Sequence, residues 1–312
     1  MKHVFIVNPK AGKTDQCARI YEMADVLRQR HGLECSVMLT DRPGGATDMA
    51  RALARSGEEV RIYACGGDGT VHEVANGIAG FSNAAMSCIP IGTGNDFLKN
   101  FGEDMGKFSD AENLWDGEVQ QLDLVDCNGR LCVTIACNGL DARVAEDVHR
   151  YGKSPLLSGM GSYIASIVVN FLFSAISRKW TVQIDGGTPV TEDFALIALC
   201  NGRYYGGGFF PIPEARMNDG ILNALVIRKV TRLEFVRLIG DYSKGHHEKL
   251  PARLAQVMPA KEIRITADED IVVCLDGECF HYREVVMRLA DKKLNFFGPK
   301  GCTPNATATP KE

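Results

Sequence analysis

A unit of strand, turn and helix recurs four times between Val4 and residue 117. Each unit runs from a short apolar segment, through a polar or glycine-rich turn, to residues with helical spacing of apolar side chains. The predicted helices cover residues 15–29, 46–55 and 71–78, and a short fourth helix begins at Phe97. Such alternation predicts a parallel sheet with helices on both faces. Ligands of these sheets bind at the carboxyl ends of the strands, where the turns fall.

The pattern changes after about residue 120 to short apolar runs separated by Gly, Asn and Asp turns. These runs predict a mainly antiparallel β-sandwich, interrupted by helices at residues 156–176 and 231–247. We therefore expect an α/β domain over residues 1–120 and a sandwich domain over residues 121–298, whose C-terminal end can return to the first domain. The small, polar residues 299–312 are expected to be disordered.

The net charge limits which partners the protein can bind, and the cysteine content indicates in which cellular compartment it is found. Thirty-five Lys and Arg against 39 Asp and Glu give a net charge of −4, which argues against a nucleic-acid partner. The eleven cysteines include no CxxC pair, and several lie in apolar runs, so we expect reduced thiols in the cytoplasm. The first residues contain only a four-residue apolar run, too short for a signal peptide.

The segment Leu156–Ile176 carries no charge over a length close to that of a membrane span. Its polar residues repeat every fourth position, which lays one small polar stripe along an otherwise apolar helix. We expect a helix packed within the protein, with entry into a membrane as the alternative.

The sequence Gly66–Gly67–Asp68–Gly69–Thr70 leaves an apolar strand and enters a helix. Glycine lets the backbone approach a phosphate, and a helix N-terminus offers unpaired N–H groups and a partial positive charge. The carboxylate of Asp68 suits a magnesium ion that is shared with phosphates. The alternative is a tight turn in which Asp68 caps the helix.

Two further turns accompany this one: residues 8–13, NPKAGK, after the first strand and residues 92–96, GTGND, after the fourth. Three such turns at one edge of a sheet predict a groove of nucleotide size. The chain has neither the dinucleotide fingerprint GxGxxG with its distant acidic residue nor the common P-loop. Asp96 is expected to cap the short helix that follows the third turn.

In this order and spacing, NPKAG, GGDGT and IPIGTGNDF resemble the diacylglycerol kinase catalytic-domain family, which includes soluble bacterial lipid kinases and the sphingosine and ceramide kinases. Further along, Pro213 with Asn218–Ile221 is similar to the family's P…DG.L stretch, and Leu275–Glu278 to its LDGE. The motifs span about residues 4 to 280. GGDGT alone is shared with NAD kinases.

The resemblance implies an ATP site, a general base and a magnesium network. Asp276 corresponds to the proposed base, with Glu278 beside it, and Asp123 to an acidic residue that helps to hold magnesium. A second, structural magnesium is implied at the Asp219 carboxylate and the carbonyls of Arg216 and Ile221. The implied ATP contacts are Asn8, Pro9, Lys10, Ala11, Gly12, Thr40, Gly66, Gly67, Asp68, Gly69, Thr70 and Thr93.

Without the resemblance, the acidic residues allow structural roles as well as catalytic ones. Asp276 ends an apolar strand, where a carboxylate can reach a cleft, but the Asp-Gly pair also favours a plain hairpin turn. Asp126 is expected to serve in a turn. The histidines and cysteines show no metal-ligand spacing, so no zinc site is expected.

We therefore expect a kinase that uses ATP and Mg²⁺ to phosphorylate the hydroxyl of a membrane-derived lipid, with diacylglycerol converted to phosphatidic acid. The expected location is the cytoplasm, peripheral at the inner membrane surface through transient contact, and a homodimer is possible. The segment 156–176 is where we expect the acyl-chain pocket or interfacial contact. The alternatives are an NAD kinase and a catalytically silent nucleotide or lipid sensor of the same fold.

Overall fold

The structure is a computed structural model that describes residues 1–12, 14–151 and 175–304. Its contacts divide the chain into two compact units. Unit 1 comprises Met1–Leu124 and the chain from Asp291 onward, and unit 2 comprises Val125–Ala290.

Unit 1 contains a six-stranded sheet in the order β2-β1-β3-β4-β15-β5. Its first four strands are parallel, and β15 continues the parallel part while β5 runs antiparallel to β15. The strands are β1 (Lys2–Val7), β2 (Glu34–Leu39), β3 (Val60–Gly66), β4 (Ala84–Pro90), β5 (Val119–Leu122) and β15 (Leu294–Phe297).

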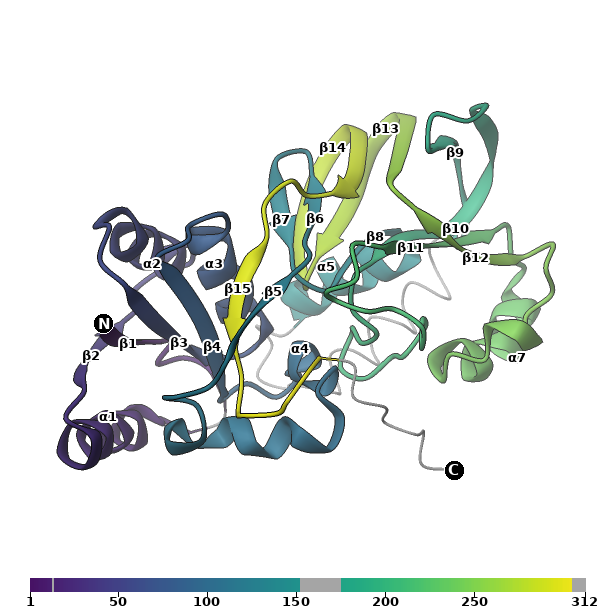
Figure 1. Cartoon of the computed structure of the whole chain (residues 1–312). Coiled ribbons are helices and arrows are strands. Elements are labelled where there is room, and N and C mark those ends of the chain that lie inside the picture. The colour runs from purple at the N-terminus through teal and green to yellow at the C-terminus, as the bar shows by residue number, and fades with distance from the viewer. Residues whose placement is uncertain (13, 152–174, 305–312) are drawn as a thin grey trace. The chain divides into compact units, whose positions relative to one another are not determined.

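Helices cover both faces of this sheet, as the alternating pattern predicts. Figure 1 shows α2 and α3 on one side of the strands and α1 on the other, in agreement with their contacts. The helix α1 ends at Gly32, whose left-handed backbone caps the helix. The helices are α1 (Cys17–His31), α2 (Gly45–Arg55), α3 (Asp68–Ile78) and α4 (Asp96–Lys99), followed by the 3₁₀ segments η1 (Gly102–Ser109) and η2 (Ala111–Asn113).

The strands β5 and β15 extend the sheet of unit 1 from distant parts of the chain. The fully buried ring of Phe296 in β15 packs against two other fully buried rings: its centroid lies 5.1 Å from that of Phe97 in α4 and 5.4 Å from that of Phe101 just after α4. The expected disorder of residues 299–312 does not extend to residues 299–304, because Cys302 is buried and its carbonyl accepts a hydrogen bond from Gln120 Nε2 (2.6 Å).

Unit 2 is the antiparallel β-sandwich that the second half of the sequence predicts. Its main path is β12-β11-β10-β8-β13-β14-β6-β7, and β8 and β9 each pair with both β10 and β13, toward opposite ends of these long strands. The strands are β6 (Val125–Cys127), β7 (Arg130–Cys132), β8 (Ile135–Gly139), β9 (Arg178–Ile184), β10 (Val190–Cys200), β11 (Leu222–Arg228), β12 (Ala255–Ala260), β13 (Glu262–Leu275) and β14 (Glu278–Leu289).

Alternate residues of these strands fill two apolar clusters. Ile197 and Val273 belong to one cluster, whereas Leu196 and Cys274 belong to the other. The second cluster also includes residues of the helices α5 (Leu140–Tyr151) and α7 (Arg232–Ser243), with the 3₁₀ turn η3 (His247–Lys249) next to α7. The period of two along each strand therefore separates a helix-covered face from a strand-packed face.

The structure corrects the helices expected in the second half of the chain. The helix at 231–247 is present as α7 and η3, but α5 was not predicted, because charged residues interrupt its apolar stripe. The predicted helix at 156–176 lies outside the described residues, except for Ala175 and Ile176. Within the described part of the chain, no helix is long and apolar enough to cross a membrane.

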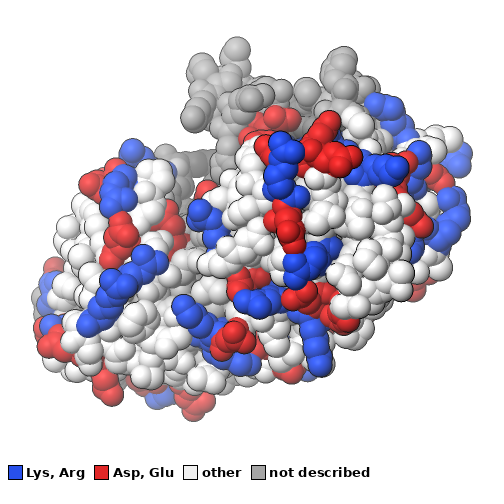
Figure 2. Space-filling view, turned by 90° about the horizontal axis from the view of Figure 1, so that it is seen from above, with Lys and Arg blue, Asp and Glu red and all other residues white. Residues whose placement is uncertain are grey.

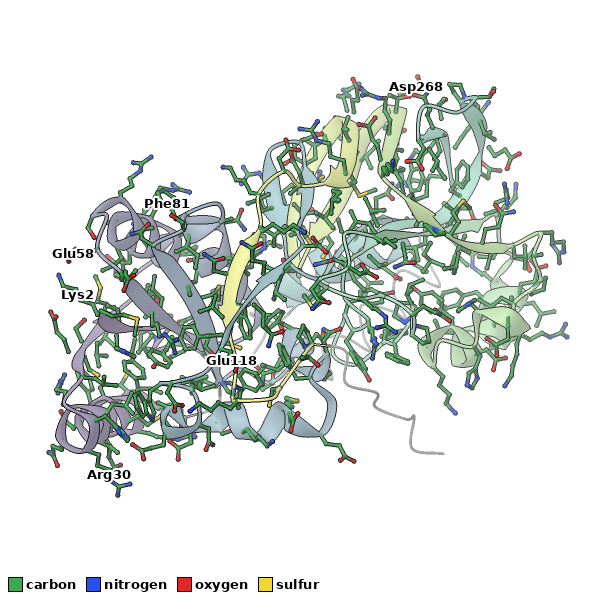
Figure 3. The ribbon with its side chains drawn as sticks, in the orientation of Figure 1. Lys2, Arg30, Glu58, Phe81, Glu118 and Asp268 are labelled. Carbon is green, nitrogen blue, oxygen red and sulfur yellow. The ribbon has the colours of Figure 1, made fainter. Side chains whose placement is uncertain are left out.

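Charged side chains of both signs are interspersed on the face seen in Figure 2. Ion pairs join several of them, among them Lys2 with Glu58, which lie side by side in Figure 3. This pair stands at the amino ends of β1 and β3, the edge of the sheet opposite to the glycine-rich turns. Exposed pairs of this kind add little stability.

We predict that Gly77→Ala destabilises unit 1. A Cβ at Gly77 in α3 would lie 2.7 Å from Ala50 Cβ and 2.8 Å from the Thr47 carbonyl of α2, so the two helices would have to separate. Overpacking of this kind costs about 1–3 kcal/mol. Calorimetry should show a melting temperature lowered by several degrees.

The control is Gly240→Ala in α7, where a Cβ would meet nothing within 4 Å. Alanine favours an exposed helix by about 1 kcal/mol over glycine, so this variant should be as stable as the wild type or more stable. Equal melting temperatures for Gly77→Ala and the wild type would contradict the close packing of α2 on α3.

Candidate active site

Three loops meet at the carboxyl edge of the parallel sheet in unit 1. They follow β1, β3 and β4, and they contain the predicted ATP contacts, with Thr40 at the end of the neighbouring strand β2. Backbone hydrogen bonds join them: Asn8 N donates to Cys65 O (3.0 Å), and Ile91 N donates to Gly66 O (2.9 Å). The topology therefore brings the predicted phosphate-binding segments of the sequence to one edge.

The loops approach so closely that only glycine fits at the points of contact. A Cβ at Gly92 would lie 2.5 Å from Gly67 Cα, and a Cβ at Gly12 would lie 2.5 Å from the Ile91 carbonyl oxygen. Gly12 also has φ of 80°, a left-handed conformation that side chains disfavour. The side chain of Asn95 adds a further link, since its Nδ2 donates to Gly92 O (2.8 Å).

The structure corrects the capping roles that the sequence allows for Asp68 and Asp96. Asp68 does not cap its own helix, because the N-cap of α3 is Gly67. Its Oδ1 instead accepts a hydrogen bond from Phe97 N (3.1 Å) at the start of α4, which ties the second loop to the third. Asp96 is the first residue of α4 rather than its cap, and its carboxylate pairs with Lys99.

Asp123 is the most deeply buried of the predicted acidic residues. Its side chain is fully buried and forms an ion pair with Lys293, which lies in the segment that returns to unit 1. A buried carboxylate requires such a counter-charge. The sequence gives no sign of this partner, since the two residues are 170 positions apart. Lys293 is a site neighbour that sequence reasoning missed.

In unit 2, Asp276 and Gly277 form the two-residue turn between β13 and β14, so the hairpin expected from the Asp-Gly pair is present. Both residues have positive φ, 51° and 98°, as a type I′ turn requires. Glu278 is exposed at the first position of β14.

The carboxylate of Asp276 faces a row of donors from residues 132–134. Val133 N donates to Oδ2 (2.7 Å) and Thr134 N to Oδ1 (2.7 Å). The Thr134 hydroxyl and the Cys132 thiol also donate to Oδ1. A plain hairpin turn does not require these contacts. They hold a half-buried carboxylate in one orientation.

Asn201, at the end of β10, fixes the same segment from the other side. Its Nδ2 donates to Val133 O (2.8 Å), and its backbone N donates to Thr134 O (2.8 Å). The two residues whose backbone N–H groups bind Asp276 are therefore also held by hydrogen bonds at their carbonyl oxygens. Asn201 is fully buried, and the sequence analysis did not single out Asn201 or Thr134.

Asp219 lies in an exposed turn, and its Oδ1 accepts a hydrogen bond from Ile221 N (3.0 Å). This bond folds residues 219–221 into a compact turn, with Gly220 in the left-handed region. Magnesium keeps several waters and often takes one protein carboxylate, so an exposed carboxylate such as that of Asp219 suits the implied ion. Among the described residues, no group of three or more His, Cys, Asp and Glu side chains is placed to hold a metal.

Asp126 accepts a hydrogen bond from Gly129 N (2.7 Å), which confirms its expected turn role.

Unit 2 also contains an apolar cavity of about 540 Å³ of empty space, part of it open to solvent. Residues of β10, β11, α5 and α7 line it, among them Leu196, Ile227, Leu238 and Ile239. That figure includes open solvent, so the space that these side chains enclose is smaller.

Comparisons with known proteins cover both units. A model of the diacylglycerol kinase catalytic domain matches residues 2–127, and a model of the YegS C-terminal NAD kinase beta sandwich-like domain matches residues 134–297. A Pseudomonas aeruginosa protein named "Probable lipid kinase YegS-like" is 29% identical over 93% of each chain. A Bacillus subtilis protein named diacylglycerol kinase is 29% identical over 88% of each chain.

Solved structures agree in fold. A crystal structure of a Bacillus anthracis protein superposes with a TM-score of 0.74 at 24% identity, over 95% of this chain and 96% of that one. A second from the same organism, named as a diacylglycerol kinase, gives 0.67 at 22% identity over the same shares. With two family models that together account for most of both units, this chain belongs to the diacylglycerol kinase family of kinases, with a C-terminal domain of the YegS type.

Proposed function

We propose that this protein is an ATP- and magnesium-dependent lipid kinase, which transfers the γ-phosphate of ATP to a lipid hydroxyl. The observation that carries the proposal is the contact between the three glycine-rich loops of unit 1. Loops of this kind offer backbone N–H groups to phosphates at the N-terminus of a helix, here α3. The names of the relatives support diacylglycerol as the first acceptor to test.

The residues of unit 1 would bind and orient the nucleotide. The loops after β1, β3 and β4, with Thr40, contact ATP, and Asp68 and Asp123 belong to the magnesium network. Oδ1 of Asp68 is held by Phe97 N, and its Oδ2 lies next to Gly94, where a Cβ would be only 2.9 Å away. When bound, magnesium neutralises phosphate charge and orients the transferred group.

Asp276 would serve as the general base. It takes the proton of the lipid hydroxyl as the hydroxyl oxygen bonds to the γ-phosphorus and the bond to the leaving ADP oxygen breaks. The donors on residues 132–134 orient its carboxylate for this step, and Glu278 follows two positions later on β14. Asp219, with the carbonyls of Arg216 and Ile221, would hold the second, structural magnesium.

A lipid as the phosphate acceptor would explain the apolar cavity of unit 2, which a water-soluble acceptor would not require. The cavity beneath α7 is lined mainly by aliphatic and aromatic side chains. Burial of alkyl surface contributes about 25 cal/mol per Å², so such a cavity favours a lipid chain. We propose peripheral contact with a membrane surface, from which the lipid is taken.

The direct test is transfer of label from γ-labelled ATP, with magnesium, to a panel of lipids in mixed micelles. We expect label on diacylglycerol or on another lipid with a free hydroxyl. The same reaction contains NAD as a soluble acceptor, and label on NAD alone would contradict the proposal. Label on no acceptor, with ATP still raising the melting temperature, would indicate a nucleotide sensor.

We predict that Asp276→Asn lowers the turnover number by about 10²–10⁴, because the amide cannot accept the proton of the lipid hydroxyl. ATP affinity, measured by calorimetry, should remain close to that of the wild type. The matched control is Asp126→Asn, which changes a turn carboxylate of the same unit and should leave turnover unchanged. Full activity of Asp276→Asn would exclude this residue as the base.

We predict that Asp68→Asn removes the charge without removing the bond to Phe97 N, because asparagine keeps an acceptor oxygen at that position. Turnover should fall at least a hundredfold, and the magnesium concentration for half-maximal rate should rise, while the melting temperature changes little. The control is Asp110→Asn, which also accepts a backbone bond, from Glu112 N, but has no proposed magnesium role. A wild-type magnesium dependence in Asp68→Asn would remove Asp68 from the network.

A further inference from the structure

The apolar cavity of unit 2 contains one acidic residue that the proposed mechanism does not use. Asp141, at the second position of α5, lines the cavity together with Leu140, Phe235, Leu238 and Ile239. Among the described residues that line it, Asp141 is the only charged side chain. An ionisable group in apolar surroundings is costly unless it is paired, so its presence requires an explanation.

Two tyrosines hold this carboxyl group from one side. The hydroxyls of Tyr205 and Tyr242 both donate to Oδ2 of Asp141, the second at 3.2 Å, and they lie 2.5 Å from each other. Tyr242 is buried on α7, and Tyr205 belongs to the glycine-rich loop after β10. Burial raises the pKa of Asp141 and also that of the Tyr242 hydroxyl.

The two oxygens of Asp141 differ in their surroundings. Both tyrosine hydroxyls bond to Oδ2, and within the described part of the chain no donor bonds to Oδ1. Among the described residues, Oδ1 is not one of the buried side-chain atoms without a hydrogen-bond partner, so it is accessible to solvent or to a ligand. The arrangement orients the group and leaves one acceptor for a ligand in the cavity.

We infer that Asp141 is a specificity-determining residue, which accepts a hydrogen bond through Oδ1 from a hydroxyl or amide N–H next to an alkyl chain in the cavity. Tyr205 and Tyr242 are positioning residues, since they act through the carboxylate. The ligand class is an amphiphile whose donor lies close to its chain.

For the lipid acceptor this inference rests on the proposed function. A lipid with a second donor, besides the hydroxyl that receives the phosphate, matches Asp141 best. Monoacylglycerol and ceramide carry such a donor, whereas both remaining positions of diacylglycerol are esters. The structure therefore favours the first two over diacylglycerol of the same chain length.

The test separates ligand recognition from catalysis. Calorimetric titration at pH 8 compares 1-octanol with methyl octyl ether, which share a chain but differ in the hydroxyl donor. The wild type should bind octanol at least about tenfold more tightly, because a bond to a charged acceptor contributes about 1.5 kcal/mol or more. Equal affinity for the two ligands, or binding of neither, would overturn the inference.

Variants assign the preference to Asp141. In Asp141→Asn the amide oxygen can stay with the two tyrosines while the amide N–H donates to either ligand, so the preference should disappear and binding should persist. Asp141→Leu should lose the preference as well. Leu238→Ala should weaken both ligands equally, and Asp193→Asn, on β10 outside this cavity, should match the wild type. A tenfold preference that survives in Asp141→Asn and Asp141→Leu would assign recognition to another group.

Kinase assays then give an independent readout. The wild type should phosphorylate monoacylglycerol or ceramide with a higher kcat/KM than diacylglycerol, and Asp141→Asn should reduce that ratio about tenfold. Transfer to diacylglycerol with no dependence on Asp141 would overturn the inference and leave the proposed function intact. Transfer to no lipid would contradict the proposed function, whereas the octanol titration would still decide the role of Asp141.

Discussion

The backbone contact between three glycine-rich loops is the constraint on which unit 1 depends. The parallel sheet delivers the ends of β1, β3 and β4 to one edge, and the loops there lie against each other at Gly67 and Gly92 and at Gly12 and Ile91. Side chains would separate them. With their backbones in contact, the loops can turn N–H groups toward a phosphate, and Asp68 can reach across to the start of α4.

Backbone amides also orient the carboxylate that we propose as the base. Asp276 projects from a type I′ turn, and the amides of Val133 and Thr134 point at its two oxygens. Asn201 clamps the carbonyls of the same two residues. These main-chain donors lie in the short bend between β7 and β8, and they hold the Asp276 side chain more rigidly than flexible side chains would. Both units thus use backbone geometry to place an acidic group.

The cavity of unit 2, in contrast, is formed by apolar contacts and not by directional hydrogen bonds. Apolar contacts shape it and set no direction for a ligand, since the hydrophobic effect is non-directional. A single carboxyl group, held on one side by two tyrosines, adds direction. An apolar wall with one oriented acceptor can therefore distinguish lipids that differ by one hydrogen-bond donor.

The local elements and their chemistry could be predicted from the sequence alone. The four strand–turn–helix units, the antiparallel second half and the glycine-rich turns follow from apolar periodicity and from glycine, which act between residues close in the chain. The edge that gathers the three loops also follows, because carboxyl ends of parallel strands share one edge. The motifs were enough to identify the family.

Only the tertiary structure decided which distant groups meet. The partnership of Asp123 with Lys293, the donors of residues 132–134 on Asp276, and the cluster of Asp141 with two tyrosines join residues between 37 and 170 positions apart. The position of β15 between β4 and β5 also joins distant parts of the chain, and only the tertiary structure showed it. Hydrogen bonds and ion pairs act over about 3 Å in space and leave no periodic trace along the chain, so the folded backbone alone sets their partners.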